Sequence, residues 1–123
     1  MFTHVMVGAD DLAASKTFYD AIFAALDIPA GQADARGRIF YRVPTGAFGI
    51  TRPIDGRAAS VANGGTIGFA AASPEQVKAW HDAGIAAGGS TCEDPPGERK
   101  PFGAYAAYLR DPAGNKLCAS CPV

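Results

Sequence analysis

Hydrophobic and polar residues alternate in several short stretches of this chain, and two longer stretches have the spacing of helices. The short stretches are rich in β-branched and aromatic residues and are bounded by turn-forming residues, which predicts strands. The predicted strands cover residues 2–8, 38–43, 47–52, 66–71, about 90–93, 105–110 and 116–120. A Pro-Thr-Gly turn separates the second from the third, and a Pro-Ala-Gly turn separates the last two, so each pair predicts a hairpin.

Two helices are predicted between these strands. The apolar residues between Leu12 and Leu26 fall near one stripe of a 3.6-residue period, and Asp10 and Asp11 are available as N-caps. The second helix begins after Ser73, because a proline follows at the first helical position and Gln76 completes a capping box. Each half of the chain is therefore predicted to run strand, helix, then two or three strands.

This order indicates an internal repeat, a duplicated βαβββ unit. The prolines of the two hairpin turns lie 68 positions apart, and the glycines of the same turns have the same offset. That offset makes Ile50 equivalent to Cys118. The leading strands match at an offset of 62, which makes His4 equivalent to Thr66.

Composition excludes several classes of protein. The 123 residues are 48% hydrophobic and 19% charged, with a formal net charge of −1, as expected for one globular domain. Scattered arginines give no footprint for nucleic acid and no basic patch for a membrane surface, and no apolar run could span a bilayer. The odd number of cysteines, three, and the lack of a secretory leader predict reduced thiols in the cytoplasm.

The chain resembles the vicinal oxygen chelate superfamily, which includes glyoxalase I, bleomycin-resistance proteins and extradiol dioxygenases. The resemblance is carried by the stretch from His4 to Leu12, by the Phe18-Tyr19 pair, and by Asp-Pro-Ala-Gly-Asn-Lys at residues 111–116. It implies an α+β fold in a single domain over residues 1–123. Two βαβββ modules, about 1–57 and 64–123, would curl their sheets into a cup. Members of this length are usually homodimers, so we expect a homodimer.

The resemblance also implies four positions for metal ligands, on the first and last strands of each module. They correspond to His4, Ile50, Thr66 and Cys118, and only His4 keeps the residue type of the family. Isoleucine has no donor atom and a threonine hydroxyl is a poor ligand, whereas a catalytic zinc normally has three protein ligands. We therefore predict no cofactor; a divalent metal at an atypical site is the alternative.

The cup is expected to be largely apolar, with a few polar side chains that orient a ligand. The candidate ligand-binding residues are His4, Phe48, Ile50, Arg52, Thr66 and Cys118. Arg52 shares the parity of Phe48 and Ile50, and its guanidinium could pair with a carboxylate or phosphate if that face lines the cup; otherwise it is a surface charge.

Three functions fit this pattern. The first is a glyoxalase-like protein that binds a small anionic or aromatic molecule without the usual metal. The second is a metal-dependent lyase, isomerase or dioxygenase with an atypical site. The third is a metal-free enzyme that uses His4 and Cys118 as catalytic residues, which needs a lowered thiol pKa. The alternative for both residues is structural: a hydrogen-bonded core histidine and a small buried hydrophobe.

Overall fold

A computed structural model describes residues 1–123 and contains two helices and two sheets. The first half comprises β1 (His4–Gly8), α1 (Leu12–Ala24), β2 (Gln32–Ala33), β3 (Ile39–Val43) and β4 (Gly46–Thr51). The second half comprises β5 (Ile67–Ala70), α2 (Pro74–Ala86), β6 (Ser90–Thr91), β7 (Gly97–Arg99), a 3₁₀ turn η1 (Lys100–Phe102), β8 (Ala104–Arg110) and β9 (Lys116–Pro122).

Each half forms its own sheet with the same topology. The first sheet has the strand order β1-β4-β3-β2, and the second has the order β5-β9-β8-β6, with β7 also paired to β8. In each sheet the first strand runs parallel to the last, and the last two strands form an antiparallel hairpin. The predicted α+β class and the repeated strand–helix–strands unit are therefore confirmed.

Both helices begin where their caps predict. The Asp11 carboxylate accepts a hydrogen bond from the Ala14 N–H at 3.0 Å, and the Ser73 hydroxyl accepts one from the Gln76 N–H at 3.2 Å. The Gln76 side chain completes the box one residue early, since its Oε1 accepts from the Ala72 N–H at 2.6 Å. Neither helix is long and apolar enough to cross a bilayer.

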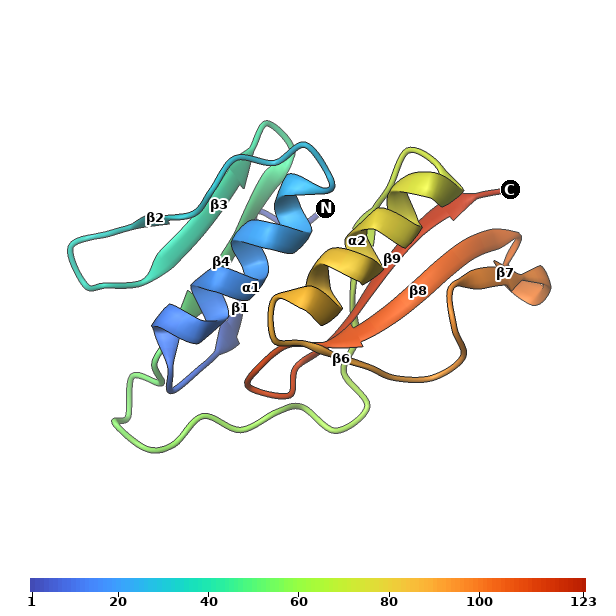
Figure 1. Ribbon diagram of the computed structural model, residues 1–123. Coiled ribbons are helices and arrows are strands. Elements are labelled where there is room, and N and C mark those ends of the chain that lie inside the picture. Colours follow the sequence, from blue (N-terminus) through green and yellow to red (C-terminus); the bar gives the residue numbers. More distant parts are fainter.

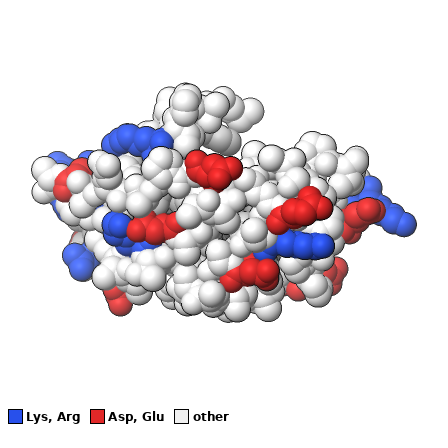
Figure 2. Space-filling model, turned by 45° about the horizontal axis from the view of Figure 1, so that its top comes forward, with Lys and Arg blue, Asp and Glu red and all other residues white.

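The two helices lie side by side and cover the same side of both sheets (Figure 1). Their inward stripes join the inward faces of the two sheets in one hydrophobic core, which includes Phe18, Ile22, Trp80, Leu109 and Leu117. The opposite face of each sheet carries no helix, and we call it the helix-free face. Acidic and basic side chains are interspersed on the side of the molecule shown in Figure 2.

A long connector from Arg52 to Thr66 links the halves and runs along one edge of the molecule (Figure 1). Besides the shared core, a polar contact between the halves lies at the last hairpin turn. There the buried Asp111 accepts hydrogen bonds from the backbone N–H groups of Ala113 and Asn115, at 3.0 and 2.8 Å. The Asn115 side chain then donates to the Gly8 carbonyl at the end of β1, at 3.1 Å.

Three short elements were not predicted: β2, β7 and η1. They lie in polar or Pro- and Gly-rich stretches, where local sequence gives no strand signal. β2 pairs with β3 at only two positions. The loop that joins them is closed by Arg38, whose Nε and one terminal guanidinium nitrogen both contact the Oδ2 atom of Asp34. β7 forms because Gly97–Arg99 pairs in antiparallel orientation with the edge of β8 that β9 leaves free. Tertiary pairing therefore decides these elements.

Candidate functional site

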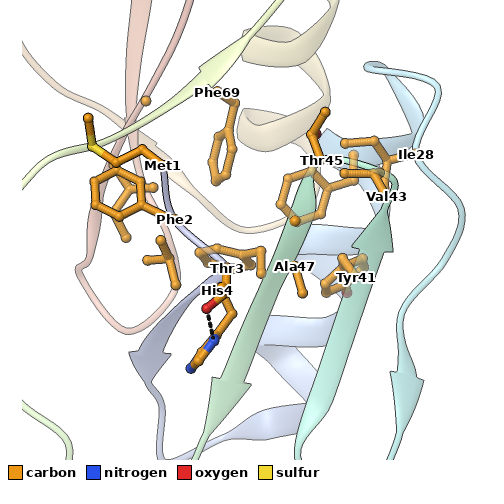
Figure 3. A pocket seen from close by; sticks show the side chains of 16 residues that line it. Met1, Phe2, Thr3, His4, Ile28, Tyr41, Val43, Thr45, Ala47 and Phe69 are labelled. Carbon is orange, nitrogen blue, oxygen red and sulfur yellow. Dashed lines mark hydrogen bonds between the residues drawn. The ribbon is translucent and has the colours of Figure 1, made fainter.

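A pocket of about 380 Å³ lies between the two halves, close to the N-terminus (Figure 3). Most of its lining is hydrophobic, with aromatic rings from four different elements: Phe23 of α1, Tyr41 of β3, Phe48 of β4 and Phe69 of β5. The edge strands β1 and β5 are not hydrogen-bonded to each other, so their sheets leave a gap at this end. The pocket occupies this gap.

The aromatic rings pack tightly against one another. The Phe23 ring centroid lies 4.7 Å from that of Tyr41, 5.5 Å from that of Phe48 and 5.0 Å from that of Phe69. Phe48 and Phe69 are 5.4 Å apart in a T-shaped pair. Because these rings belong to both halves, they hold the pocket wall rigidly, and they offer a ligand both ring faces and ring edges.

Polar groups are few and lie at the mouth. The His4 Nδ1 and the Thr3 hydroxyl are 2.9 Å apart, and both residues line the pocket (Figure 3). The Tyr41 hydroxyl is already used, since it donates to the Asp20 carboxylate at 2.7 Å. Burial and this hydrogen bond raise the pKa of Tyr41, which stays neutral. His4, Thr3 and Thr45 are therefore the polar side chains that remain to orient a ligand.

The structure brings two of the predicted site residues together in this pocket, His4 and Phe48. Two others lie outside it. Arg52 follows the end of β4 and is exposed, with its Nε 3.3 Å from the Asp10 carbonyl oxygen that accepts its hydrogen bond. Thr66 is exposed in the connector, one residue before β5 begins.

The prediction that Ile50 shares a surface with His4 is wrong. Ile50 is fully buried, and its side chain is part of the core under α1. Strand register explains this: Met6 is directly opposite Gly49 in the β1–β4 pair, so Gly49, not Ile50, lies on the helix-free face with His4. The position equivalent to Cys118 therefore has no side chain.

Ile50 was placed on the wrong face because the second hairpin is one residue longer than the first. Nine positions separate the paired residues Phe40 and Gly49 in the first hairpin, whereas ten separate Tyr108 and Cys118 in the second. The repeat offset thus changes from 68 to 69 within the hairpin, and a one-residue shift moves a side chain to the other face of a strand. Phe48 shares the inward parity of Ile50 and reaches the pocket from the core side.

Cys118 lies on the helix-free face of the second sheet, directly opposite Tyr108. It is only 9% exposed, and burial raises the pKa of its thiol above the ordinary value. The Tyr108 ring has two cations over it, the Arg99 guanidinium at 5.7 Å and the Lys116 ammonium at 5.3 Å. His4 and Cys118 lie in different sheets, and Cys118 does not line the pocket between the halves.

The metal-ligand positions of the family offer few donors here. With the register corrected they are His4, Gly49, Thr66 and Cys118, which supply one imidazole and one thiol. No three side chains among the His, Cys, Asp and Glu residues converge as a metal site within the chain. These residues do not fit the divalent ion that the family uses.

Sequence reasoning missed Tyr41 and Phe69 as pocket residues. Both have the inward parity of their strands, which marks them as core positions, and both are core neighbours in the structure. In the structure Phe69 lies on an edge strand beside the gap between the repeats, which no pattern in the sequence shows. Periodicity gives the face of a strand but not the place where two sheets separate.

Comparison with known proteins identifies the family. The sequence model of a protein family, the Glyoxalase/Bleomycin resistance protein/Dioxygenase superfamily, matches residues 1–119, nearly the whole chain. The chain belongs to this superfamily. The family assignment and the glyoxalase-like fold predicted from the sequence are thereby confirmed.

Solved structures of this superfamily have the same architecture. A glyoxalase/bleomycin resistance protein from Albidiferax ferrireducens T118 is 59% identical, with a TM-score of 0.93 over 98% of this chain and 97% of that chain. A putative glyoxalase from Bacillus halodurans is 23% identical, with a TM-score of 0.79 over 99% and 96%. A lactoylglutathione lyase from Agrobacterium tumefaciens is 24% identical, with a TM-score of 0.68 over 98% and 92%. The last two show the fold alone. No curated protein matches the chain.

Proposed function

We propose that this glyoxalase-like protein binds a small aromatic or aliphatic molecule in the pocket between its two halves, without a divalent metal. The observation that carries the proposal is the cluster of four aromatic rings from both halves around a cavity of about 380 Å³. That size and lining are typical of small-molecule sites, where apolar walls supply affinity and a few polar groups fix orientation. His4, Thr3 and Thr45 are the orienting groups.

The chemistry of the side chains favours binding over catalysis. A thiol enzyme needs a thiolate, and burial moves the pKa of Cys118 in the opposite direction. A metal-dependent lyase or dioxygenase would need more metal ligands than the His4 imidazole and the Cys118 thiol supply. Elemental analysis of the purified protein tests this part directly, because a stoichiometric divalent metal would contradict it.

Binding can be tested with a neutral aromatic probe, 1-naphthalenemethanol, followed by chemical shift changes of the pocket residues. A blocking variant is available at Gly68, which lines the pocket and has open space where a Cβ would be. We expect Gly68→Leu to weaken binding at least tenfold, because its side chain would enter the mouth. Gly97→Leu is the matched control, a strand glycine outside the pocket whose Cβ would meet only ordinary contacts.

The chemical shift titration of the unmodified protein and of Gly68→Leu decides whether the pocket binds the probe. Shift changes around Phe48 and Phe69 that saturate and are lost only in Gly68→Leu support the proposal. Absence of any saturable shift in the unmodified protein overturns it.

We also propose that the protein is a homodimer in the cytoplasm. β2 and β6 are the terminal strands on the outer sides of the two sheets, and unpaired strand edges are surfaces on which a second copy can pair. Phe2 and Phe102 add exposed apolar surface, at 70% and 79% exposure. The three cysteines are free thiols, as expected in a reducing compartment. Light scattering at micromolar concentration tests the dimer, and a monomeric mass would contradict it.

A further inference from the structure

A second hollow, of about 340 Å³, lies on the helix-free face of the first sheet. It is distinct from the pocket between the halves, which is lined by no arginine. The charged and titratable side chains of the hollow are those of Arg38, Arg42, His4 and Asp34. The proposed function makes no use of these arginines, so the hollow is a candidate for a separate site.

Strand pairing places His4 and Arg42 in one row across the sheet. His4 is directly opposite Ala47 in the β1–β4 pair, and Ala47 is directly opposite Arg42 in the β3–β4 pair. Directly paired residues point to the same face of a sheet, so the imidazole and the guanidinium both project from the helix-free face. Neighbouring strands are about 4.8 Å apart, so roughly 10 Å separates the two backbone positions. The small side chain of Ala47 leaves the space between them open.

The Phe40 ring lies beside both guanidinium groups of the hollow. The guanidinium carbons of Arg38 and Arg42 are 5.3 and 4.6 Å from the centroid of this ring, which orders both side chains. Arg38 has a counter-ion, because its Nε and one terminal nitrogen are each 2.6 Å from Oδ2 of Asp34. Arg42 has no carboxylate within 4.0 Å. One carboxylate against two guanidiniums leaves the hollow with an uncompensated positive charge.

We propose that this hollow binds the phosphate group of a small phosphate monoester against Arg42, Arg38 and His4. The site goes beyond the proposed function and does not depend on it. A phosphate monoester offers three acceptor oxygens and a charge of about −1.5 to −2 near pH 7. A carboxylate offers two oxygens, which a single guanidinium fork can satisfy.

The donors of the hollow come from two strands that flank β4, and this arrangement favours the phosphate. Arg42 approaches from β3, and its planar guanidinium can donate to two oxygens at once. His4 approaches from β1. Its Nδ1 is 2.9 Å from the Thr3 hydroxyl, and when Nδ1 accepts this hydrogen bond, Nε2 carries the hydrogen and donates to a further oxygen.

The organic part of the ester lies against the next row of the sheet, which consists of Met6, Gly49 and Phe40. Gly49 has no side chain, and its neighbours lean over it from both sides. A Cβ at Gly49 would fall 2.9 Å from the Phe40 ring and would collide with the Met6 sulfur. Met6 and Phe40 therefore close into an apolar wall beside the charged row, as small-molecule sites require.

The test titrates the protein with three probes that contain the same ring: phenyl phosphate, benzoate and benzyl alcohol. Binding is followed by the NMR signals of the His4 imidazole and the Arg42 guanidinium. We expect phenyl phosphate to bind at least fivefold more tightly than the other two probes, and this preference should shrink as salt is added. Arg42→Gln should weaken its binding roughly three- to tenfold. Arg57→Gln is the matched control, because it removes the same charge from an exposed connector residue outside the hollow.

The position of the shift changes separates this site from the pocket. Saturable shifts of His4 and Arg42 with phenyl phosphate, weakened in Arg42→Gln but not in Arg57→Gln, support the proposal. Shifts confined to Phe48 and Phe69 overturn it while the pocket proposal stands. Benzoate binding as tight as that of phenyl phosphate overturns the phosphate assignment. Absence of any saturable shift with phenyl phosphate overturns the site.

Discussion

The Tyr19 hydroxyl donates a hydrogen bond to the Asp111 carboxylate at 2.5 Å, and this bond joins residues 92 positions apart. Tyr19 belongs to α1 of the first half, and Asp111 to the last turn of the second half. Both side chains are buried, and Asn115 donates to the same Asp111 oxygen at 2.9 Å. The Tyr and the Asp-Pro-Ala-Gly-Asn turn that indicate the family are thus two parts of one contact between the modules.

Removing this hydroxyl should destabilise the fold. Tyr19→Phe deletes one donor to a buried carboxylate while keeping the ring, so we expect the free energy of unfolding to fall by about 1 to 3 kcal/mol. Urea denaturation measures the change. Tyr105→Phe is the control, because no hydrogen bond engages the Tyr105 hydroxyl in the structure. Equal effects of the two substitutions would contradict the role of the Tyr19–Asp111 bond.

The stability of the protein in acid should depend on Asp20. Burial alone would raise the pKa of this carboxyl, but hydrogen bonds from Lys16, the Gly31 N–H and Tyr41 outweigh burial and hold the pKa below its ordinary value. A lowered folded-state pKa gives stability that is present above the unfolded-state pKa, about 3.9, and is lost as the pH falls below it.

This acid dependence can be measured as the urea midpoint between about pH 5 and pH 2. We expect the midpoint to fall less steeply with decreasing pH in Asp20→Asn than in the unmodified protein. Asp82→Asn, an exposed carboxyl on α2 without an ion pair, is the control and should keep the full slope. An unchanged slope in Asp20→Asn would refute the assignment.

The packing of α2 against β8 and α1 requires a glycine at position 84. A Cβ there would fall well inside contact distance of the Leu109 side chain and 3.1 Å from that of Ile22. Alanine favours a helix by about 1 kcal/mol over glycine, but overpacking a core costs about 1 to 3 kcal/mol. We therefore expect Gly84→Ala to lower the thermal midpoint, whereas Asp82→Ala on the exposed face of α2 should change the unfolding free energy by less than about 0.5 kcal/mol. A raised midpoint in Gly84→Ala would show that the helices can separate to admit a methyl group.

Cys118 should react slowly with alkylating reagents. Its thiol is nearly covered and its pKa is raised by burial, so the thiolate fraction at pH 8 is below that of an exposed cysteine. We expect its carbamidomethylation, followed by mass spectrometry, to lag free cysteine at least tenfold at pH 8 and to accelerate as the pH rises. Labelling as fast as that of free cysteine would support the hypothesis that Cys118 is a catalytic nucleophile.

Sequence alone predicts the fold well because the signals for it are local. The caps Asp11 and Ser73, the turn residues and the alternation of strands each act over a few residues, and the structure confirms the elements they predict. The site is harder, because the face on which a residue lies depends on the hairpin register. One extra residue in the second hairpin was enough to place Ile50 on the wrong face.

The surroundings of the arginines could not be predicted for a different reason. Arg36, Arg38 and Arg42 look scattered along a polar loop and a strand, and only the folded chain brings Arg38 and Arg42 together in one hollow with His4. Arg52 was expected to share a face with Ile50, but β4 ends at Thr51, so strand parity no longer applies to it. Long-range strand pairing, which periodicity does not encode, decides which residues surround these arginines.

The connector from Arg52 to Thr66 has a consequence for assembly. Each half alone would expose its inward aromatic and aliphatic side chains to water until the other half covers them. Two separate halves could therefore combine only in a bimolecular association step. A covalent tether turns that encounter into an intramolecular event with an effective concentration in the millimolar range. Joining the modules therefore makes completion of the common interior independent of how dilute the protein is.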